Sequence, residues 1–254
     1  MSHALEVSGL TVRFGGLEAL GDVSFAIEEG ATTALIGPNG AGKTTCLNVV
    51  SGLQRATAGS VRYQGRDVTA LAPHKRRYLG RTFQIAEPFA GMTVEESVQV
   101  GVEARGRIGL GRAALRIGTR RRERSSRERA SELIERMGLG PVASRLVETL
   151  PLGHQRVVEF ARALAQDPEL LLLDEAASGL SGSEMEQLAG HVLACRDEGR
   201  TVVLIEHNMR FVTRLARHLL VLDRGKLLYD GETAAGLRDP AVVSAYLGGS
   251  DGAA

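Results

Sequence analysis

The sequence predicts an α/β fold: a mostly parallel sheet with crossover helices, preceded by antiparallel strands and interrupted once by a helical insertion. Apolar and polar residues alternate in residues 5–14 and 23–27, which is typical of antiparallel strands with one solvated face. Residues 93–150 instead carry Arg, Glu, Ala and Leu at helical spacing, with a helix expected to start at Ser131 and Glu132, and they predict the insertion. Continuous apolar runs separated by helical stretches predict the parallel strands; they cover residues 34–36, 170–173, 201–205 and 219–222.

The length of the chain, 254 residues, suits one α/β domain that contains an inserted subdomain. We expect this domain to cover residues 1–235, with its core at about 1–90 and 151–235 and its helical subdomain at about 91–150. Residues 236–254 are expected to form a C-terminal helical tail with a flexible end.

Composition excludes several classes of protein. Apolar residues make up 43% of the chain and the formal net charge is +1, so a sizeable core is possible and the strongly basic balance of a general nucleic-acid binder is absent. The apolar runs are far shorter than the roughly 18 residues of a membrane-spanning helix, and the first twenty residues lack the continuous apolar stretch that would predict a secretory signal. We therefore expect a cytoplasmic protein. Cys46 and Cys195 lack partners at disulfide or metal-ligand spacing and are expected to be reduced packing residues.

A glycine-rich segment fits the phosphate-loop pattern GxxxxGK[ST], between the strand at residues 34–36 and a helix expected over residues 44–50 with Gly52 as its C-cap. In such a loop the backbone N–H groups and the helix N-terminus bind phosphates. Lys43 should reach the β- and γ-phosphates, the Thr44 hydroxyl should bind Mg²⁺, and Thr45 should donate to a phosphate. The segment consists of Gly37, Pro38, Asn39, Gly40, Ala41, Gly42, Lys43 and Thr44.

Two adjacent carboxylates follow the apolar run at residues 170–173. A nucleotide-hydrolysing site needs a group that holds the metal and a group that activates water. We expect Asp174 to hold Mg²⁺, mostly through water, and Glu175 to act as the general base that polarises the attacking water.

Together with two further segments, RTFQ at residues 81–84 and VLIEH at 203–207, these motifs make nearly the whole chain resemble the ATP-binding subunit of an ABC transporter. The resemblance implies a P-loop NTPase (RecA-like) core, an N-terminal antiparallel β subdomain, an inserted α-helical subdomain, and hydrolysis of ATP with Mg²⁺. It implies that Gln84 meets the metal or the attacking water and couples the site to the membrane subunits. It also implies that His207 contacts the γ-phosphate and that Phe14 stacks on the adenine ring.

The family's LSGGQ signature is altered here to LPLGHQ at residues 150–155. In the family this segment caps the γ-phosphate of ATP held by the opposite subunit, with a serine hydroxyl and glycine amides at a helix N-terminus. Pro151 offers neither a hydroxyl nor an N–H, whereas Gly153 and a helix from about His154 remain. Ser181 stands where the family commonly has an aspartate that acts across the dimer. We therefore hypothesise a heterodimer in which this chain donates the weaker half-site; a homodimer stays open.

Four further segments indicate a subgroup within this family. They are FGG at residues 14–16, the Arg-rich insertion, LGHQR at 152–156 and AYLG at 245–248. These segments resemble the subgroup that serves branched-chain amino acid importers. The resemblance implies a peripheral subunit on the cytoplasmic face of the membrane, with transmembrane permeases, a second ATP-binding subunit and an extracytoplasmic substrate-binding protein as partners, and no nucleic acid. Alternatives are import of urea or short amides, export of lipopolysaccharide, a soluble non-transport ABC ATPase, and a P-loop kinase.

A basic segment at residues 105–129 carries ten arginines against Glu123 and Glu128, a charge of +8. Three interpretations stay open: contact with anionic lipid headgroups or acidic loops, a solvated helical face, and RNA binding, which the absence of interleaved aromatic residues makes the weakest.

Overall fold

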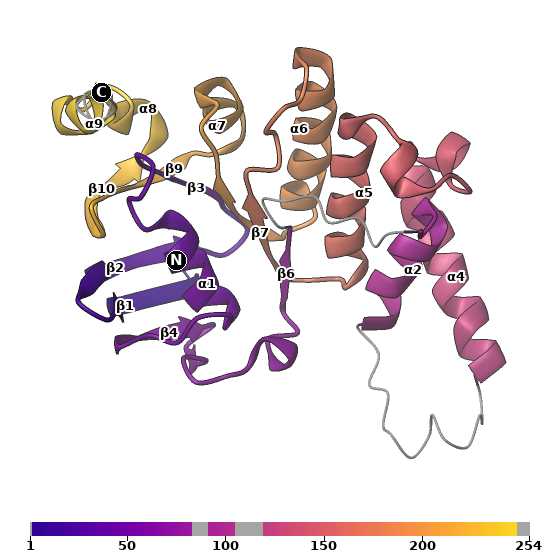
Figure 1. Cartoon of the computed structure of the whole chain (residues 1–254), viewed down its shortest axis with the longest axis horizontal. Coiled ribbons are helices and arrows are strands. Elements are labelled where there is room, and N and C mark those ends of the chain that lie inside the picture. Colours follow the sequence, from indigo (N-terminus) through magenta and orange to yellow (C-terminus); the bar gives the residue numbers. More distant parts are fainter. Residues whose placement is uncertain (1, 83–90, 105–118, 248–254) are drawn as a thin grey trace.

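The computed structural model describes residues 2–82, 91–104 and 119–247, and of residues 119–123 only the backbone (Figure 1). Gln84 and most of the basic segment therefore lie outside the described residues, as does the glycine-rich end of the tail. Within the described residues, no helix has the length and apolar character needed to cross a bilayer.

Two sheets form the strand layers of the molecule. The antiparallel sheet has the order β2-β1-β4-β5, and the second sheet has the order β10-β9-β3-β8-β7-β6 with only the β9–β10 hairpin antiparallel. This arrangement confirms the α/β fold with antiparallel strands at the N-terminus. The strands are β1 His3–Phe14, β2 Leu17–Glu28, β3 Thr32–Ile36, β4 Ala58–Tyr63, β5 Arg66–Asp67, β6 Leu79–Arg81, β7 Leu170–Asp174, β8 Thr201–Ile205, β9 His218–Asp223 and β10 Lys226–Glu232.

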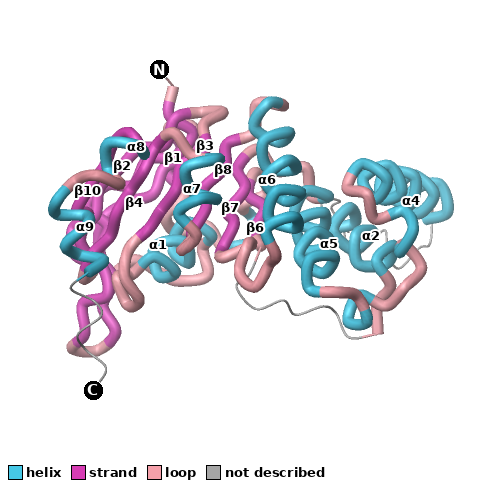
Figure 2. The backbone as a smooth tube through the Cα atoms, turned by 90° about the horizontal axis from the view of Figure 1, so that it is seen from above, coloured by secondary structure: helices cyan, strands magenta, loops and turns pink. Residues whose placement is uncertain are grey.

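Helices cover the parallel sheet and form a separate group beside it. Helices α2 and α4 pack on each other and on α5, at the end of the molecule that lies away from the antiparallel sheet (Figures 1 and 2). The helices are α1 Lys43–Ser51, α2 Val94–Ala104, α4 Thr119–Arg136, α5 Leu152–Ala165, α6 Gly182–Asp197, α7 Met209–Leu215, α8 Thr233–Gly236 and α9 Pro240–Leu247, with 3₁₀ turns at Pro73–Lys75, Gly140–Val142 and Val147–Thr149.

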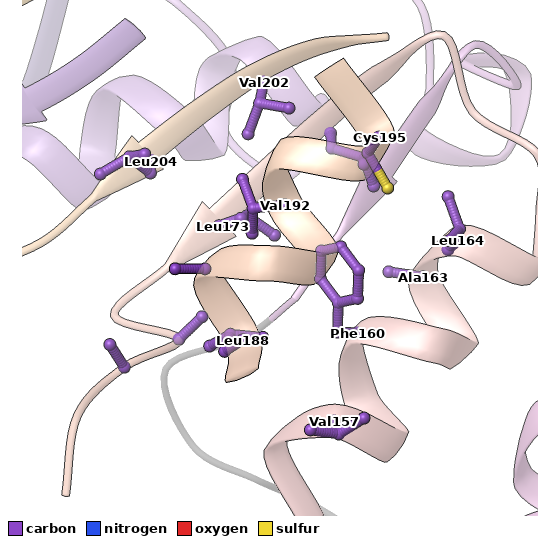
Figure 3. Packing of buried hydrophobic residues seen from close by; sticks show 14 of the residues in the cluster. Val157, Phe160, Ala163, Leu164, Leu173, Leu188, Val192, Cys195, Val202 and Leu204 are labelled. Atoms are coloured by element: carbon purple, nitrogen blue, oxygen red, sulfur yellow. The ribbon is translucent and has the colours of Figure 1, made fainter. Parts of the chain in front are cut away.

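The core explains why the central strands read as continuous apolar runs. Leu170 and Leu172 of β7 join a cluster with α1 and the antiparallel sheet, whereas Leu171 and Leu173 join a cluster with α5, α6 and α7. Figure 3 shows the second cluster, with Phe160 of α5 facing α6. Both faces of the sheet are thus covered, and alternation is lost because neither face meets water. Cys46 and Cys195 are free and buried in these clusters, as predicted.

Two helix starts differ from the prediction. Helix α4 begins at Thr119, not at Ser131, because the Arg, Glu and Ala residues before Ser131 are strong helix formers and the exposed serine needs no capping role there. Helix α5 begins at Leu152, two residues before His154, with Pro151 as its N-cap at φ −55°. Proline is tolerated there because its missing N–H would have no helical partner.

Candidate nucleotide site

The phosphate loop occupies the expected turn between β3 and α1. It closes through a hydrogen bond from the Ala41 N–H to the Pro38 carbonyl at 3.1 Å. Gly42, the N-cap of α1, has φ 99°, and a Cβ there would lie 2.7 Å from the Ala19 carbonyl oxygen. Both the left-handed conformation and the close approach of β2 therefore require glycine at this position.

Lys43 is held inside the loop. Its Nζ donates to the carbonyl oxygens of Gly37 at 2.8 Å and Pro38 at 3.0 Å, and the residue is only 6% exposed. Burial lowers the pKa of the ammonium, while the negative charges of Glu175 and Asp174 oppose that shift. Because both acceptors are neutral carbonyls, an anionic phosphate oxygen is a stronger acceptor for this ammonium.

A pocket of about 600 Å³ lies over the loop, a size typical of small-molecule sites. It brings together nine of the predicted residues from three distant parts of the chain. Phe14 ends the alternating pattern at residues 5–14, and periodicity alone would also suit a core residue there. It is instead 49% exposed, and it lines this pocket. The lining consists of Phe14, Leu17, Glu18, Ala19, Asn39, Gly40, Ala41, Gly42, Lys43, Thr44, Thr45, Glu175, Arg224 and Gly225.

Glu175 and His207 meet beside the pocket, although they follow different strands. The Glu175 backbone has φ 52°, its N–H donates to the Ile205 carbonyl at 2.9 Å, and its Oε1 lies 3.2 Å from Nε2 of His207. A left-handed conformation is unfavourable for a residue with a side chain. The backbone bond to the end of β8 holds this turn and directs the carboxylate toward the histidine.

Asp174 has the features of a magnesium ligand. Its side chain is 2% exposed, and Oδ2 accepts a hydrogen bond from Nη2 of Arg81 at 2.9 Å. Its other oxygen, Oδ1, is buried and has no hydrogen-bond partner among the described residues. A carboxylate oxygen with no other partner suits Mg²⁺, which prefers oxygen ligands. The Asp174 carboxylate therefore fits the ion. Thr44, the second predicted ligand, lines the nucleotide pocket, and Gln84, the third, lies outside the described residues.

The signature segment lies apart from this pocket. Gly153 is buried at the N-terminus of α5 and does not line the chain's own nucleotide pocket. A Cβ at Gly153 would overlap the carboxylate of Glu184. Hydrogen bonds from Ser181, and a smaller contribution from the Gly153 N–H, lower the pKa of that carboxyl. Ser181 and Glu184 form the capping box of α6, so Ser181 has a structural role where the family commonly has aspartate.

The sequence interpretation missed several residues at the site. Arg224 and Gly225 reach the pocket from the β9–β10 turn, where both have positive φ. The Asp-Arg-Gly sequence after the predicted strand at 219–222 indicates a turn, but it does not indicate that this turn lies against the nucleotide pocket. Glu206 belongs to the VLIEH segment at 203–207, where the sequence points only to His207. The Glu206 residue is nevertheless 3% exposed, and its Oε1 accepts a hydrogen bond from the Ala177 N–H at 2.8 Å.

Burial is the main cause of an unusual pKa at Glu206. Desolvation raises the pKa of its carboxyl to about 7, hydrogen bonds from the Ala177 and His207 backbones lower it, Glu175 raises it, and Arg156 lowers it. Because the folded pKa lies above the unfolded value, the folded state binds the extra proton between about pH 4.5 and 7. The free energy of unfolding must therefore fall as the pH rises through that window.

Glu206→Gln is expected to remove this pH dependence, since glutamine stays neutral and can still accept from Ala177. Relative to wild type, the variant should gain on the order of 3 kcal/mol in unfolding free energy between pH 5 and pH 8. Denaturant unfolding at the two pH values measures the gain, with Glu132→Gln, an exposed glutamate of α4, as control. A difference between Glu206→Gln and wild type that is the same at both pH values contradicts the expectation.

Comparison with known proteins identifies the family. The family model described as ABC transporter matches residues 20–178. The chain is 39% identical over 249 residues to the high-affinity branched-chain amino acid transport ATP-binding protein BraF of Pseudomonas aeruginosa, covering 96% of this chain and 97% of the relative. It is 36% identical over 248 residues to LivG of Escherichia coli, a protein with the same description, again covering 96% and 97%.

Solved structures agree with the sequence comparison. An ATP-binding cassette of an ABC transporter in its ADP conformation has a TM-score of 0.85 and 30% identity, and the match covers 98% of this chain and 100% of the other. A nucleotide-free cassette from an ABC transporter also has a TM-score of 0.85. Family match, relatives and fold coincide over the loop and the acidic pair described above, and the chain belongs to the ABC transporter family as one of its ATP-hydrolysing subunits.

Proposed function

We propose that the chain energises an importer of branched-chain amino acids as its ATP-binding subunit. The observation that carries the proposal is identity of 36–39% over 96% of the chain to proteins described as branched-chain amino acid transport ATP-binding proteins. The chain would act as a peripheral subunit on the cytoplasmic face of the membrane. Its partners would be transmembrane permeases, a second ATP-binding subunit and an extracytoplasmic substrate-binding protein.

In this proposal the site residues divide the binding and hydrolysis of ATP among them. The loop amides and Lys43 hold the phosphates of ATP, and Phe14 stacks on the adenine ring. Thr44 and Asp174, with Gln84, would hold Mg²⁺, which supplies positive charge beside the β- and γ-phosphates. Glu175 accepts the proton of the attacking water. His207 orients that carboxylate and contacts the γ-phosphate. Residues 1–235 act as one ATPase domain, with 236–254 as its C-terminal tail.

Purification from membranes tests the proposal. The tagged chain, extracted in mild detergent from cells that express it with its neighbouring genes, should bring down permease subunits, and those cells should accumulate labelled leucine in an ATP-dependent manner. Uptake of urea or short amides without leucine would favour the related importers, and altered lipopolysaccharide export would favour the exporters. Recovery of the chain without any permease would contradict a transport role and favour a soluble ABC ATPase.

We further propose that the second ATP-binding subunit is a different chain. Two features support a weak contribution of this chain to its partner's site. Pro151 has no N–H to offer, and the Gly153 N–H is already next to the negative Glu184 carboxylate. A second anion, the γ-phosphate of the partner's ATP, would meet electrostatic repulsion there. The partner's nucleotide would therefore be hydrolysed slowly, while this chain's own ATP would be capped by the partner's signature.

Mixed dimers should accordingly lose turnover unequally. Glu175→Gln in this chain alone should lower ATPase activity by about 10-fold or more, because it disables the faster of the two sites. The corresponding glutamate-to-glutamine change in the partner alone should lower activity by less than about twofold. Steady-state hydrolysis by the two singly substituted dimers measures the contrast. Equal losses in the two dimers would rule out the asymmetry.

A further inference from the structure

One buried guanidinium connects three elements of the nucleotide site. Arg81 is the last residue of β6, which pairs with β7, and its side chain is 5% exposed. Its Nη2 donates to Oδ2 of Asp174 at 2.9 Å. Its Nη1 donates to Oδ1 of Asn48 and to Oγ of Ser51, both at 2.8 Å and both on α1. The helix that begins at the phosphate-loop lysine is thereby tied to the carboxylate at the end of β7.

The next residue holds the backbone of the same aspartate. The Asp174 N–H donates to the Thr82 hydroxyl at 3.3 Å, and the Thr82 N–H donates to the Leu172 carbonyl at 3.0 Å. Arg81 and Thr82 therefore restrain both the side chain and the main chain of Asp174. Of the two carboxylate oxygens, Oδ2 is used by Arg81, and Oδ1 has no partner among the described residues.

Stability alone is a weak reason for such an arrangement, because the cost of burying two charges offsets most of their attraction. The geometry of the guanidinium is a stronger reason for the arrangement. The planar fork of a guanidinium can bond in two directions at once, whereas an ammonium acts as a point charge. Groups that orient a metal-binding side chain typically change metal affinity or activity by about 10- to 100-fold when they are removed.

We propose that Arg81 is a positioning residue for the metal-binding carboxylate: it fixes Oδ2 of Asp174 against α1 and so presents Oδ1 to the magnesium ion that accompanies ATP. This inference rests on the proposed role of Asp174 in metal binding. Arg81 touches neither nucleotide nor metal in this scheme, and it acts through Asp174. Its removal should weaken metal binding far more than it weakens binding of the nucleotide itself.

Binding of Mn²⁺ to the ADP-loaded full-length chain, followed by electron paramagnetic resonance, measures this effect independently of turnover. Arg81→Met should weaken Mn²⁺ binding by about 10- to 100-fold. ADP affinity in EDTA should stay within about twofold of wild type, since the loop amides and Lys43 are unchanged. When Asp174→Asn is already present, adding Arg81→Met should cause no further loss of Mn²⁺ affinity, because the two changes act on one interaction.

Arg76→Met is the matched control. Arg76 is also buried, and its Nη1 donates to the carbonyls of Val49 and Val50 on α1 at 3.1 and 2.6 Å, but no hydrogen bond or ion pair to Asp174 is found for it among the described residues. Mn²⁺ affinity should therefore be unchanged in this variant. An equal loss in Arg76→Met and Arg81→Met would show that anchoring α1 is what matters, and would overturn the proposal.

A conservative variant covers the case in which Arg81→Met does not fold. Arg81→Lys keeps a positive charge beside Asp174, but its donors share one nitrogen on a shorter side chain and lack the planar fork that bonds to Asp174 and α1 in fixed directions. Mn²⁺ affinity should therefore fall by at least about threefold, and not at all when Asp174→Asn is present. Unchanged Mn²⁺ affinity in the folded variants would overturn the role of Arg81 but not the proposed metal site. Failure of the wild-type chain with ADP to bind Mn²⁺ would overturn the proposed metal site together with the role of Arg81.

Discussion

Lys43→Ala is expected to weaken the binding of MgATP by about 100-fold or more and to abolish measurable turnover. The ammonium is buried and already bonded to two loop carbonyls, so it is positioned for phosphate before nucleotide arrives. Alanine removes the one cation of the loop and leaves the backbone amides. Isothermal titration with ATP and Mg²⁺ measures the affinity, and circular dichroism checks that α1 still forms.

Lys75→Ala is the control for Lys43→Ala. Lys75 is exposed on the 3₁₀ turn Pro73–Lys75, so its substitution removes the same charge from the chain without entering the pocket. Its ATP affinity should equal that of wild type. If Lys43→Ala bound ATP as tightly as Lys75→Ala, the assignment of residues 37–45 as the phosphate site would be wrong.

Glu175→Gln is expected to lower ATP hydrolysis by about 10²- to 10⁴-fold, the usual effect of losing a general base. Glutamine has the same shape and can keep the contact with His207, but it cannot accept the proton of water. Binding of ATP should be retained, because the phosphate loop is untouched. Single-turnover hydrolysis and ATP titration separate the two effects.

The Glu132→Gln variant serves again as the control. It makes the same glutamate-to-glutamine change at an exposed position of α4 that does not line the nucleotide pocket. Normal hydrolysis is expected for it. Hydrolysis by Glu175→Gln at a rate close to that of this control would mean that another group activates the water.

Local pattern was enough to predict the phosphate loop and six of the ten strands that the structure describes; β4, β5, β6 and β10 were not predicted. The central strands are buried on both faces, so their apolar runs were continuous, and the loop is a contiguous motif whose glycines are needed where they stand. Asp174 and Glu175 could be predicted because they follow such a run directly. The start of α4 could not, because Ser131 looks like a cap in sequence and is an exposed helical residue in the structure.

Contacts between distant segments account for what the sequence did not reveal. Arg224 lines the pocket because the β9–β10 turn folds over the loop, and nothing local distinguishes it from other turn arginines. Arg81 and Glu206 are charged residues within the RTFQ and VLIEH segments. Only the structure shows that the side chain of Arg81 and the residue Glu206 are buried and that they bond to the strand and the turn that carry the acidic pair. Their importance depends on burial, which composition and spacing do not encode.

The central claim is that Lys43 binds the phosphates of ATP and that Glu175 activates the water that hydrolyses it. The most direct test is to identify, by chromatography, the nucleotide that remains bound to the protein after gel filtration. After incubation with MgATP, Glu175→Gln should elute with intact ATP, wild type should elute with ADP or none, and Lys43→Ala combined with Glu175→Gln should elute empty. Recovery of ADP from Glu175→Gln, or of ATP from the double variant, would contradict the account.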